Sequence, residues 1–337
     1  MDDSLEIKED AVLRVMNLSV DFDVKGNNVS ILSKVNFGLG LGETLGIVGE
    51  SGCGKSMTAL ALLRMVPSPP GKISDGEVLL NNVDLMTLSQ KEIKNIRGKE
   101  ISMIFQEPMT SLNPVFTVGN QLVETILEHK DLSRVDALKE AIELLRLVQI
   151  PAPEQRIKEY PHQLSGGMRQ RIMIAMALVC EPKVLIADEP TTALDVTVQA
   201  QIFDLLKEIQ AKTQMSIILI THDFGAISEM ADRVIVMYAG YKVEEGTLDE
   251  IRNSPLHPYT QGLLRSMLVI KPDSSGFKMP LPEIPGSVPD LLNRQPGCPF
   301  GPRCSQATVK CRSMPPNFNL GFKRSVKCWL ADNGRVE

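Results

Sequence analysis

Hydrophobic and polar positions alternate in two early stretches, Val12–Val24 and Val29–Leu39, and this period of two predicts a pair of short strands. The turn-forming residues 25–28 between them indicate an antiparallel β-edge. A compact apolar strand, Thr44–Val48, then runs into a glycine-rich turn. An Ala- and Leu-rich helix is expected from Lys55 to about Met65, where prolines 67, 69 and 70 stop it.

The second half of the chain has the pattern of a parallel sheet. The stretch 107–177 is helical in pattern, and two wholly apolar strands, Val184–Ala187 and Ser216–Ile220, flank a helix at Val198–Thr213. Continuous apolar strands joined by a helix are typical of a parallel sheet covered on both faces, so we predict the α/β class. From Pro255 onward the chain becomes rich in proline, which places a domain boundary near residue 260.

The glycine-rich turn carries specific chemistry. Residues 49–56 fit G-x-x-x-x-G-K-[ST] between a predicted strand and a predicted helix, the context that a phosphate-binding loop requires. Successive backbone N–H groups of such a loop point at phosphate oxygens, while the lysine bridges the β- and γ-phosphates and the hydroxyl ligates Mg²⁺. The predicted nucleotide-binding residues are Gly49, Glu50, Ser51, Gly52, Cys53, Gly54, Lys55, Ser56 and Met57.

Two neighbouring carboxylates, Asp188 and Glu189, follow the apolar strand that begins at Val184. Ligands bind at the carboxyl ends of parallel strands, and neighbouring side chains point to opposite sides of a strand. We therefore expect Asp188 to serve Mg²⁺, usually through water, and Glu189 to polarise the attacking water as general base. Without the phosphate-binding loop, such a pair would more often be a solvated turn.

Further motifs follow in an order that resembles the ATP-binding-cassette (ABC) family. Ser165-Gly166-Gly167-Met168 opens a helix that extends to Leu178, and it precedes the acidic strand, a Leu194-Asp195 turn and Thr221-His222. The resemblance implies a P-loop NTPase cassette with a RecA-like parallel-sheet core, an antiparallel β subdomain and a helical subdomain at about 107–175. The cassette would span 11–260, followed by a C-terminal extension, 261–337.

The resemblance also assigns roles to single residues of this sequence. Gln106 would contact Mg²⁺ and the attacking water, and His222 would hold the γ-phosphate. Ser165, Gly166 and Gly167 would contact the γ-phosphate bound to a partner subunit, and Asp195 would couple the two sites. Phe22 would stack on adenine, although ordinary core packing also explains a phenylalanine in a β-edge. The cofactors implied are ATP and Mg²⁺, and a nucleotide-sandwiched dimer follows because the signature is used in trans.

Two features resemble one branch of the family, the ATP-binding subunits of dipeptide and oligopeptide permeases. Met168 stands where most of the wider family has glutamine. The proline-rich part of the chain from Pro255 onward, called the tail below, matches the branch at 257–260, 284–289, 297–300 and 302–304. Nickel and some oligosaccharide importers share this architecture, so the substrate stays open. The branch implies a second, distinct ATPase subunit, two membrane permease subunits, an extracellular substrate-binding protein and a place on the cytoplasmic face of the membrane.

The tail holds four of the six cysteines of the chain: Cys298, Cys304, Cys311 and Cys328. Four thiolates in a proline-rich segment with little core would anchor a metal that orders it. No tight C-x₂₋₄-C pair of the kind usual for zinc is present, and wider spacings suit an iron–sulfur cluster. Some members of the permease branch carry a [4Fe–4S] cluster on matching cysteines, and we expect one here, with zinc, free thiols or a disulfide as alternatives.

Composition excludes some functions. The formal net charge of −5 argues against a chain that mainly neutralises nucleic-acid phosphates, so no nucleic-acid partner is expected. No apolar run approaches the roughly 20 residues that cross a bilayer, and the acidic start of the chain is unlike a signal peptide. Two other functional classes are alternatives: a non-transport cassette ATPase acting on DNA or ribosomes, and an iron–sulfur electron carrier with a vestigial nucleotide fold.

Overall fold

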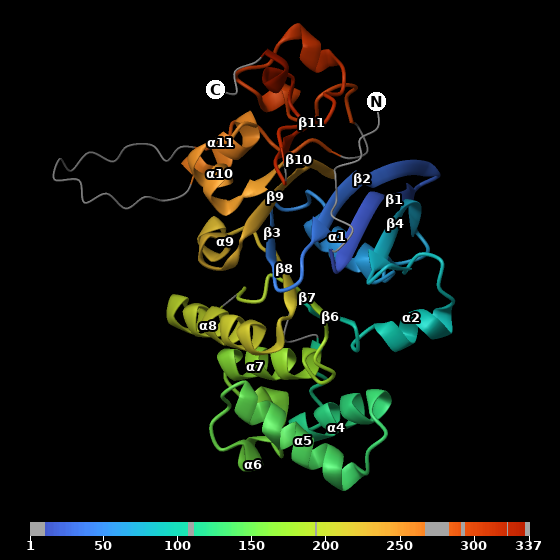
Figure 1. Cartoon of the computed structure of the whole chain (residues 1–337), viewed down its shortest axis with the longest axis vertical. Coiled ribbons are helices and arrows are strands. Elements are labelled where there is room, and N and C mark those ends of the chain that lie inside the picture. Colours follow the sequence, from blue (N-terminus) through green and yellow to red (C-terminus); the bar gives the residue numbers. More distant parts are fainter. Residues whose placement is uncertain are drawn as a thin grey trace, which may run out of the picture.

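The computed structural model describes residues 11–106, 111–192, 194–266, 283–290, 294–321 and 323–333. Their strands form two sheets, which lie in the upper and middle parts of the molecule in Figure 1. The smaller sheet is antiparallel in the order β2-β1-β4-β5. Its strands are β1 (Leu13–Val24), β2 (Asn27–Leu39), β4 (Gly71–Leu80) and β5 (Val83–Asp84).

The predicted hairpin at the start of the chain is confirmed. Val24 pairs with Asn27 across a turn in which Lys25 and Gly26 both have positive φ, 54° and 80°. Such turns match the right-handed twist of the strands that they join. The sequence pattern did not predict β4, because that strand begins at Gly71, directly after the prolines that ended the expected helix.

The larger sheet has the order β11-β12-β10-β9-β3-β8-β7-β6. The five neighbouring strands β9, β3, β8, β7 and β6 are parallel, which confirms the α/β prediction. The remaining three join antiparallel, so residues 318–319 and 325–326 of the tail extend the same sheet. The strands are β3 (Thr44–Val48), β6 (Ile101–Ile104), β7 (Val184–Asp188), β8 (Ser216–Ile220), β9 (Arg233–Tyr238), β10 (Tyr241–Thr247), β11 (Phe318–Asn319) and β12 (Ser325–Val326).

The parallel strands are buried on both faces, as their continuous apolar sequences require. In β7, Val184 and Ile186 pack in one core with the antiparallel sheet and helix α1 (Lys55–Leu62). Leu185 and Ala187 pack in a second core with helices α8 (Val196–Thr213) and α9 (Phe224–Met230). The alternation of side chains along each strand therefore divides the hydrophobic residues between two layers.

Helix α1 ends at Leu62, three residues before the expected Met65. Arg64 adopts a positive φ of 51°, which no α-helix accommodates, and the prolines follow only after that break. The other helices outside the region 111–177 are α2 (Gln90–Ile96), α10 (Leu248–Asn253) and α11 (Pro258–Arg265), with short 3₁₀ turns at Gly301–Arg303, Val309–Arg312 and Trp329–Asn333.

The predicted helical region forms the lower end of the molecule in Figure 1, opposite the tail. It consists of α4 (Val118–His129), α5 (Arg134–Leu147), α6 (Pro153–Arg156), a 3₁₀ turn (Pro161–Gln163) and α7 (Gly166–Ala177). Thr117 and Ser133 cap the amino ends of α4 and α5 by accepting hydrogen bonds from backbone N–H groups. Residues 107–110, also predicted to be helical, lie outside the described residues. None of the helices described is long and apolar enough to cross a membrane.

Candidate active site

The loop between β3 and α1 folds as a phosphate-binding loop because of its glycines. Gly49 and Gly54 have φ values of 156° and 105°. A Cβ on Gly49 would lie 2.3 Å from the carbonyl oxygen of Met237, and one on Gly54 would lie 2.6 Å from Leu32. Side chains are therefore excluded at both positions, and the loop curls tightly at the amino end of α1, where the helix dipole favours anions.

Lys55 lies inside this loop and is buried. Its ammonium group donates hydrogen bonds to the carbonyl oxygens of Gly49 at 2.7 Å and Glu50 at 3.1 Å. The positive charge is therefore held at the centre of the curl, beside the backbone N–H groups. The third partner of the Lys55 ammonium is the Cys53 sulfur, at 3.9 Å. The ammonium can exchange these acceptors for phosphate oxygens, with which it forms charge-assisted hydrogen bonds.

Ser56 and Asp188 meet across the loop and the end of β7. The Ser56 hydroxyl donates to the Asp188 carboxylate over 3.1 Å, and Asp188 is buried. Burial raises the pKa of Asp188, and the bond from Ser56 opposes that rise. Hydroxyl and carboxylate oxygens are the hard ligands that Mg²⁺ takes, directly or through retained water, so the donor set fits the predicted ion.

Glu189 is the centre of a second cluster, in which the three predicted catalytic residues come together. The side-chain amide of Gln106 donates to one carboxylate oxygen over 2.9 Å, and the other oxygen lies 3.0 Å from Nδ1 of His222. The backbone of Glu189 has a φ of 48°, a strained value for a residue with a side chain. The Glu189 carboxylate thus contacts Gln106 and His222, whereas that of Asp188 contacts Ser56.

Thr192 completes this cluster, and the sequence analysis did not identify it. Its hydroxyl donates to the Glu189 carboxylate over 2.9 Å. Burial alone would raise the pKa of Glu189, but the bonds from His222, Thr192 and Gln106 outweigh it and lower that pKa. The carboxylate is therefore ionised at neutral pH, as a general base must be. The only sequence signal for Thr192 is its position three residues after Glu189.

The predicted signature and turn residues cap helices. Ser165 accepts a hydrogen bond from the N–H of Met168 at the start of α7, and Asp195 accepts one from Val198 at the start of α8. Gly166 and Gly167 form the first turn of α7. In the part of the chain that the structure describes, no hydrogen bond joins Ser165 or Asp195 to the loop 49–56 or to Glu189, so these residues belong to a separate surface of the same subunit.

Phe22 lies in β1 opposite Val29 of β2 and Gly71 of β4. Its ring is partly buried against the core that includes the antiparallel sheet, and a Cβ on Gly71 would lie 2.7 Å from the ring. The structure thus shows the core packing that was the alternative explanation for this residue. The partly exposed ring leaves the adenine contact as a prediction.

The four tail cysteines do come together, but in an arrangement that corrects the cluster prediction. With Phe300 and Trp329 they line a cavity of about 10 Å³, which is large enough for about one water molecule. Burial raises the pKa of the Cys298 and Cys304 thiols, and that of Cys328 to about 11, which favours the neutral thiol at these three positions. The predicted ligands were Cys298, Cys304, Cys311 and Cys328.

Among the described residues, no group of three or more Cys, His, Asp or Glu side chains is arranged to hold a metal ion. The prediction of a [4Fe–4S] cluster is therefore wrong, and zinc has no support either. The spacing of the cysteines indicated that they would gather, but it did not show that an aromatic and thiol packing would fill the space between them. All six cysteines of the chain are free.

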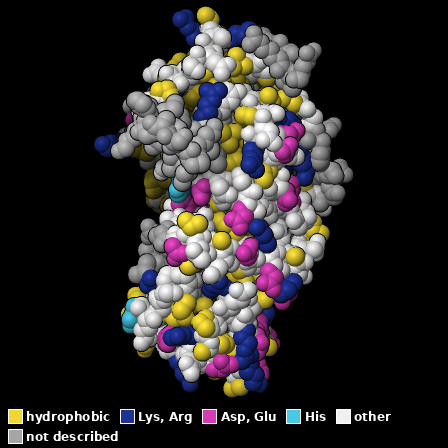
Figure 2. All heavy atoms as spheres, turned by 90° about the vertical axis from the view of Figure 1, so that its left-hand side faces the viewer, with side chains coloured by type: hydrophobic (Ala, Val, Ile, Leu, Met, Phe, Trp, Pro, Cys, Tyr) yellow, Lys and Arg dark blue, Asp and Glu magenta, His cyan; other side chains and the backbone are white. Residues whose placement is uncertain are grey.

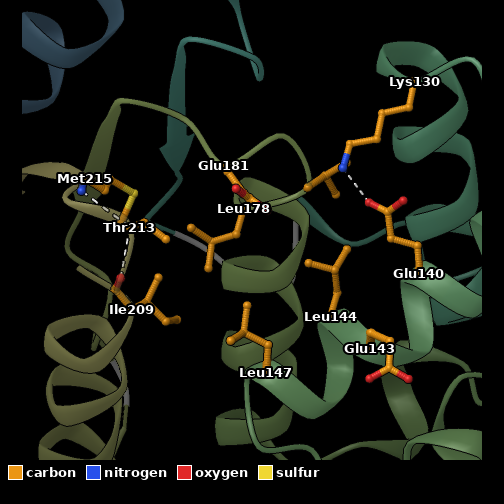
Figure 3. Close-up of a pocket in the computed structure, with 11 residues that line it drawn as sticks. Lys130, Glu140, Glu143, Leu144, Leu147, Leu178, Glu181, Ile209, Thr213 and Met215 are labelled. Carbon is orange, nitrogen blue, oxygen red and sulfur yellow. Dashed lines mark hydrogen bonds and ion pairs between the residues drawn. The ribbon is translucent and has the colours of Figure 1, made fainter. Parts of the chain in front are cut away.

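A groove of about 490 Å³ lies at the carboxyl end of α7, between α5 of the helical region and α8. Figure 3 shows Leu144 and Leu147 of α5 facing Leu178, with Ile209 of α8 and Met215 beyond them. The floor is apolar, while the charged residues at its margin are Lys130, Glu140, Glu143 and Glu181. Lys130 is paired with Glu140 at 2.5 Å, so the margin is acidic overall.

Hydrophobic side chains are also exposed around the helical region. Val115, Val135 and Leu138 are each more than two-fifths exposed. Figure 2 shows such side chains lying among charged ones on one face of the lower end of the molecule. Exposed apolar side chains beside an apolar groove are typical of a surface that another protein covers.

Two models of known protein families match this chain, one in each of its two parts. The model described as ABC transporter matches residues 32–192, and the model described as oligopeptide/dipeptide transporter, C-terminal region, matches residues 243–311. The dipeptide transport ATP-binding protein DppD of Bacillus subtilis is 53% identical over 322 residues, 95% of each chain. The oligopeptide transport ATP-binding protein OppD of the same organism is 52% identical, covering 96% of this chain and 90% of that one.

Other relatives are equally extensive. DppD of Haemophilus influenzae is 49% identical, covering 94% of this chain and 95% of that protein. Among solved structures, the dimeric ATP-binding cassette MJ0796 bound to ADP and Pi is 28% identical with a TM-score of 0.63, covering 70% of this chain and 98% of that one. The cbiO1 protein of Clostridium perfringens is 30% identical with a TM-score of 0.62, covering 72% of this chain and 91% of that one. The descriptions of these relatives name transport ATP-binding proteins and no iron–sulfur cluster.

Proposed function

The chain belongs to the ATP-binding proteins of dipeptide and oligopeptide ABC transporters, and we propose that it hydrolyses ATP at the loop 49–56 to drive peptide import. The observation that carries this proposal is the convergence of two clusters at one edge of the parallel sheet. Ser56 and Asp188 form the first, and Glu189, Gln106 and His222 form the second. The first suits a phosphate-bound Mg²⁺, and the second suits the activation of water.

We assign the steps of hydrolysis to residues of this chain. Lys55 and the loop N–H groups bind the β- and γ-phosphates of ATP, and Phe22 stacks on adenine. Ser56, Gln106 and Asp188 would hold Mg²⁺, which would neutralise the charge that develops on the phosphates. Glu189 accepts a proton from the attacking water as its oxygen bonds to the γ-phosphorus and the bond to the ADP oxygen breaks. His222 holds the γ-phosphate and orients Glu189.

One subunit supplies only half of each site in this scheme. Ser165, Gly166 and Gly167 would contact the γ-phosphate bound to the second subunit, with Asp195 coupling the two sites. Support comes from their position at helix starts away from the loop 49–56, and from the dimeric state of the similar cassette. We propose a distinct ATP-binding subunit as the partner, which makes a heterodimer.

We propose that the groove beside Leu144 receives a cytoplasmic segment of a membrane permease subunit, which places the chain at the cytoplasmic face of the membrane. The acidic margin supports this occupant, because cytoplasmic loops of membrane proteins carry an excess of Lys and Arg. The apolar floor would take the hydrophobic face of a short helix. The substrate-binding protein would act only through the permease subunits.

A pair of matched variants tests the groove. Leu147 lies in it and is 40% exposed, whereas Val135, on the same helix, is 65% exposed and does not line it. Leu147→Asp should abolish co-purification with the permease subunits and leave ATP binding unchanged, while Val135→Asp should retain both. Equal co-purification of the two variants would exclude this docking site.

We propose that residues 11–260 form the cassette, with the helical subdomain at about 107–175. Residues 261–337 would form a C-terminal extension that contains the four clustered cysteines.

The whole function is tested in proteoliposomes that contain the chain, its partner ATPase, the permease subunits and the binding protein. ATP should drive uptake of a labelled dipeptide, and Lys55→Ala should stop it. Uptake of nickel or an oligosaccharide in place of the peptide would show that the proposed substrate class is wrong, while the proposed ATPase function would stand.

A further inference from the structure

Glu50, the second residue of the phosphate-binding loop, is held by a side chain from the tail. The Arg303 guanidinium donates to both oxygens of the Glu50 carboxylate, at 2.7 and 3.0 Å. The side chain of Arg303 is only 6% exposed and that of Glu50 is 27% exposed. A two-pronged pair of this kind fixes direction as well as distance, because the planar guanidinium and carboxylate must align.

Arg303 is itself fixed by three further bonds. It donates to the carbonyl oxygens of Pro285 at 2.9 Å and Ile284 at 3.2 Å, and to the Tyr238 hydroxyl at 3.3 Å. Every nitrogen of the guanidinium is therefore engaged. The position of Arg303 therefore depends on Ile284, Pro285 and the end of β9, and its two bonds to Glu50 pass that position on.

The backbone of Glu50 is held by a second group from beyond the parallel strands. Its N–H donates to the hydroxyl of Tyr259 in α11 over 2.8 Å. The ring of Tyr259 is fully buried, with its centre 4.7 Å from that of Tyr238 and 5.4 Å from that of Phe300. Phe300 lies three residues before Arg303, so one aromatic cluster supports both contacts to Glu50.

These contacts reach the phosphate-binding groups in one step. The carbonyl oxygen of Glu50 is one of the two that accept hydrogen bonds from Lys55. A shift of Glu50 would therefore move both the lysine and the first N–H groups of the loop. Phosphate binding requires these donors to converge, and a small misplacement weakens every bond at once.

We propose that Arg303 and Tyr259 are positioning residues of the phosphate-binding loop, through which the C-terminal region sets the affinity of the loop for ATP. The proposal rests on the proposed ATPase function and extends it to residues outside the cassette motifs. A purely structural role for the two contacts would lower the stability of the protein. It would not change the affinity for ATP in the protein that stays folded.

The test uses the purified full chain and a set of single and double variants. Arg303→Gln removes the charged pair, and Tyr259→Phe removes only the hydroxyl that accepts the Glu50 N–H and keeps the ring in its cluster. Lys310→Ala is the matched control, because it breaks an ion pair of the same tail, with Asp332, at the solvent-exposed surface. Binding of Mg²⁺-ATP is measured by calorimetry, ATP turnover gives kcat and KM, and thermal unfolding shows that each variant is folded.

We expect Kd and KM for ATP to rise about five- to tenfold in Arg303→Gln and in Tyr259→Phe, the range of a modest coupling between sites, with little change in kcat. Arg303→Lys, which keeps the charge without the two-pronged geometry, should be intermediate. Lys310→Ala should match the parent. A Glu50→Gln/Arg303→Gln double variant should bind ATP no more weakly than the weaker single variant, because the two side chains act as one pair.

The outcomes separate this inference from the function on which it rests. If the parent and Lys310→Ala bind ATP and Tyr259→Phe and Arg303→Gln, both folded, bind it equally well, the positioning role is overturned and the ATPase function stands. If the parent itself does not bind ATP, both are overturned. Should Arg303→Gln fail to fold, Tyr259→Phe and Arg303→Lys still decide the question.

Discussion

Replacing Glu43 with glutamine tests whether ion pairs join the tail to the cassette. The Glu43 carboxylate, in the turn before β3, accepts hydrogen bonds from Arg233 at 3.0 Å, from Lys323 of the tail at 2.8 Å and from the N–H of Gly40 at 2.6 Å. Burial alone would raise the pKa of Glu43, but Arg233 first and then Lys323 and Gly40 outweigh it. They lower that pKa from 4.5 to about 2.

The size of the effect follows from this shift. A difference of about 2.5 pKa units corresponds to about 3 kcal/mol at about 1.4 kcal/mol per unit. Because solvent reaches part of the group, we expect about 2 kcal/mol from the pairing. A carboxyl whose folded-state pKa is lowered stabilises the fold above its unfolded pKa. That contribution is lost as the pH falls from about 4.5 through about 2.

Urea unfolding of the parent and of Glu43→Gln at pH 7, and thermal unfolding at intervals down to pH 2, provide the assay. The variant should lose about 2 kcal/mol at pH 7 and should show a shallower fall of stability with acid than the parent. Glu128→Gln is the control, since that carboxylate forms a solvent-exposed pair with Lys94 and its loss should leave the stability nearly unchanged. Parallel stability curves for the parent and Glu43→Gln would refute the reasoning.

Three further predictions concern the site and the core beneath it. Thr192→Val keeps the volume but removes the hydroxyl that donates to Glu189. It should raise the pKa of Glu189 and lower kcat severalfold with KM for ATP unchanged. An unchanged kcat would show that this hydrogen bond does not contribute to catalysis. The acid limb of kcat against pH in the parent should lie below pH 4.5, because the pKa of Glu189 is lowered from that value, and a limb near pH 6 would point to another base. Leu62→Ala, in the fully buried end of α1, should cost about 3 kcal/mol in urea unfolding, whereas Val83→Ala, at an exposed position, should cost less than about 0.5 kcal/mol. Equal losses from the two would contradict the assignment of α1 to the core.

The elements around ATP could be predicted from sequence because each has a local signal. The strand Thr44–Val48 keeps the same bounds in the structure, and the glycines and Lys55 follow it directly. The Glu189 cluster could be expected in part, since Glu189 ends an apolar strand and His222 follows another. Thr192 was missed because its contact depends on the strained backbone of Glu189, which no pattern of residue types reveals.

The contacts of the tail could not be predicted in this way. Arg303 and Glu50 are 253 positions apart, and nothing in the residues near either one indicates the other. The strands β9 and β10 were not predicted from the sequence pattern. The pairing of β12 with β10 involves only two residues of each strand. The cysteines show the opposite error. Their grouping in sequence was real, but the chemistry inferred from it required a metal-holding arrangement that the described residues do not form.

The central claim is that Glu189 activates water for ATP hydrolysis at the loop 49–56. It is tested most directly by measuring ATP binding and single-turnover hydrolysis in the Glu189→Gln variant of the complete transporter. Glutamine keeps an acceptor for Thr192 and His222 but cannot take a proton. We predict that the variant binds ATP and holds the closed dimer, while hydrolysis falls by about 10²- to 10⁴-fold. Hydrolysis at the parental rate by a variant that binds ATP would contradict the account.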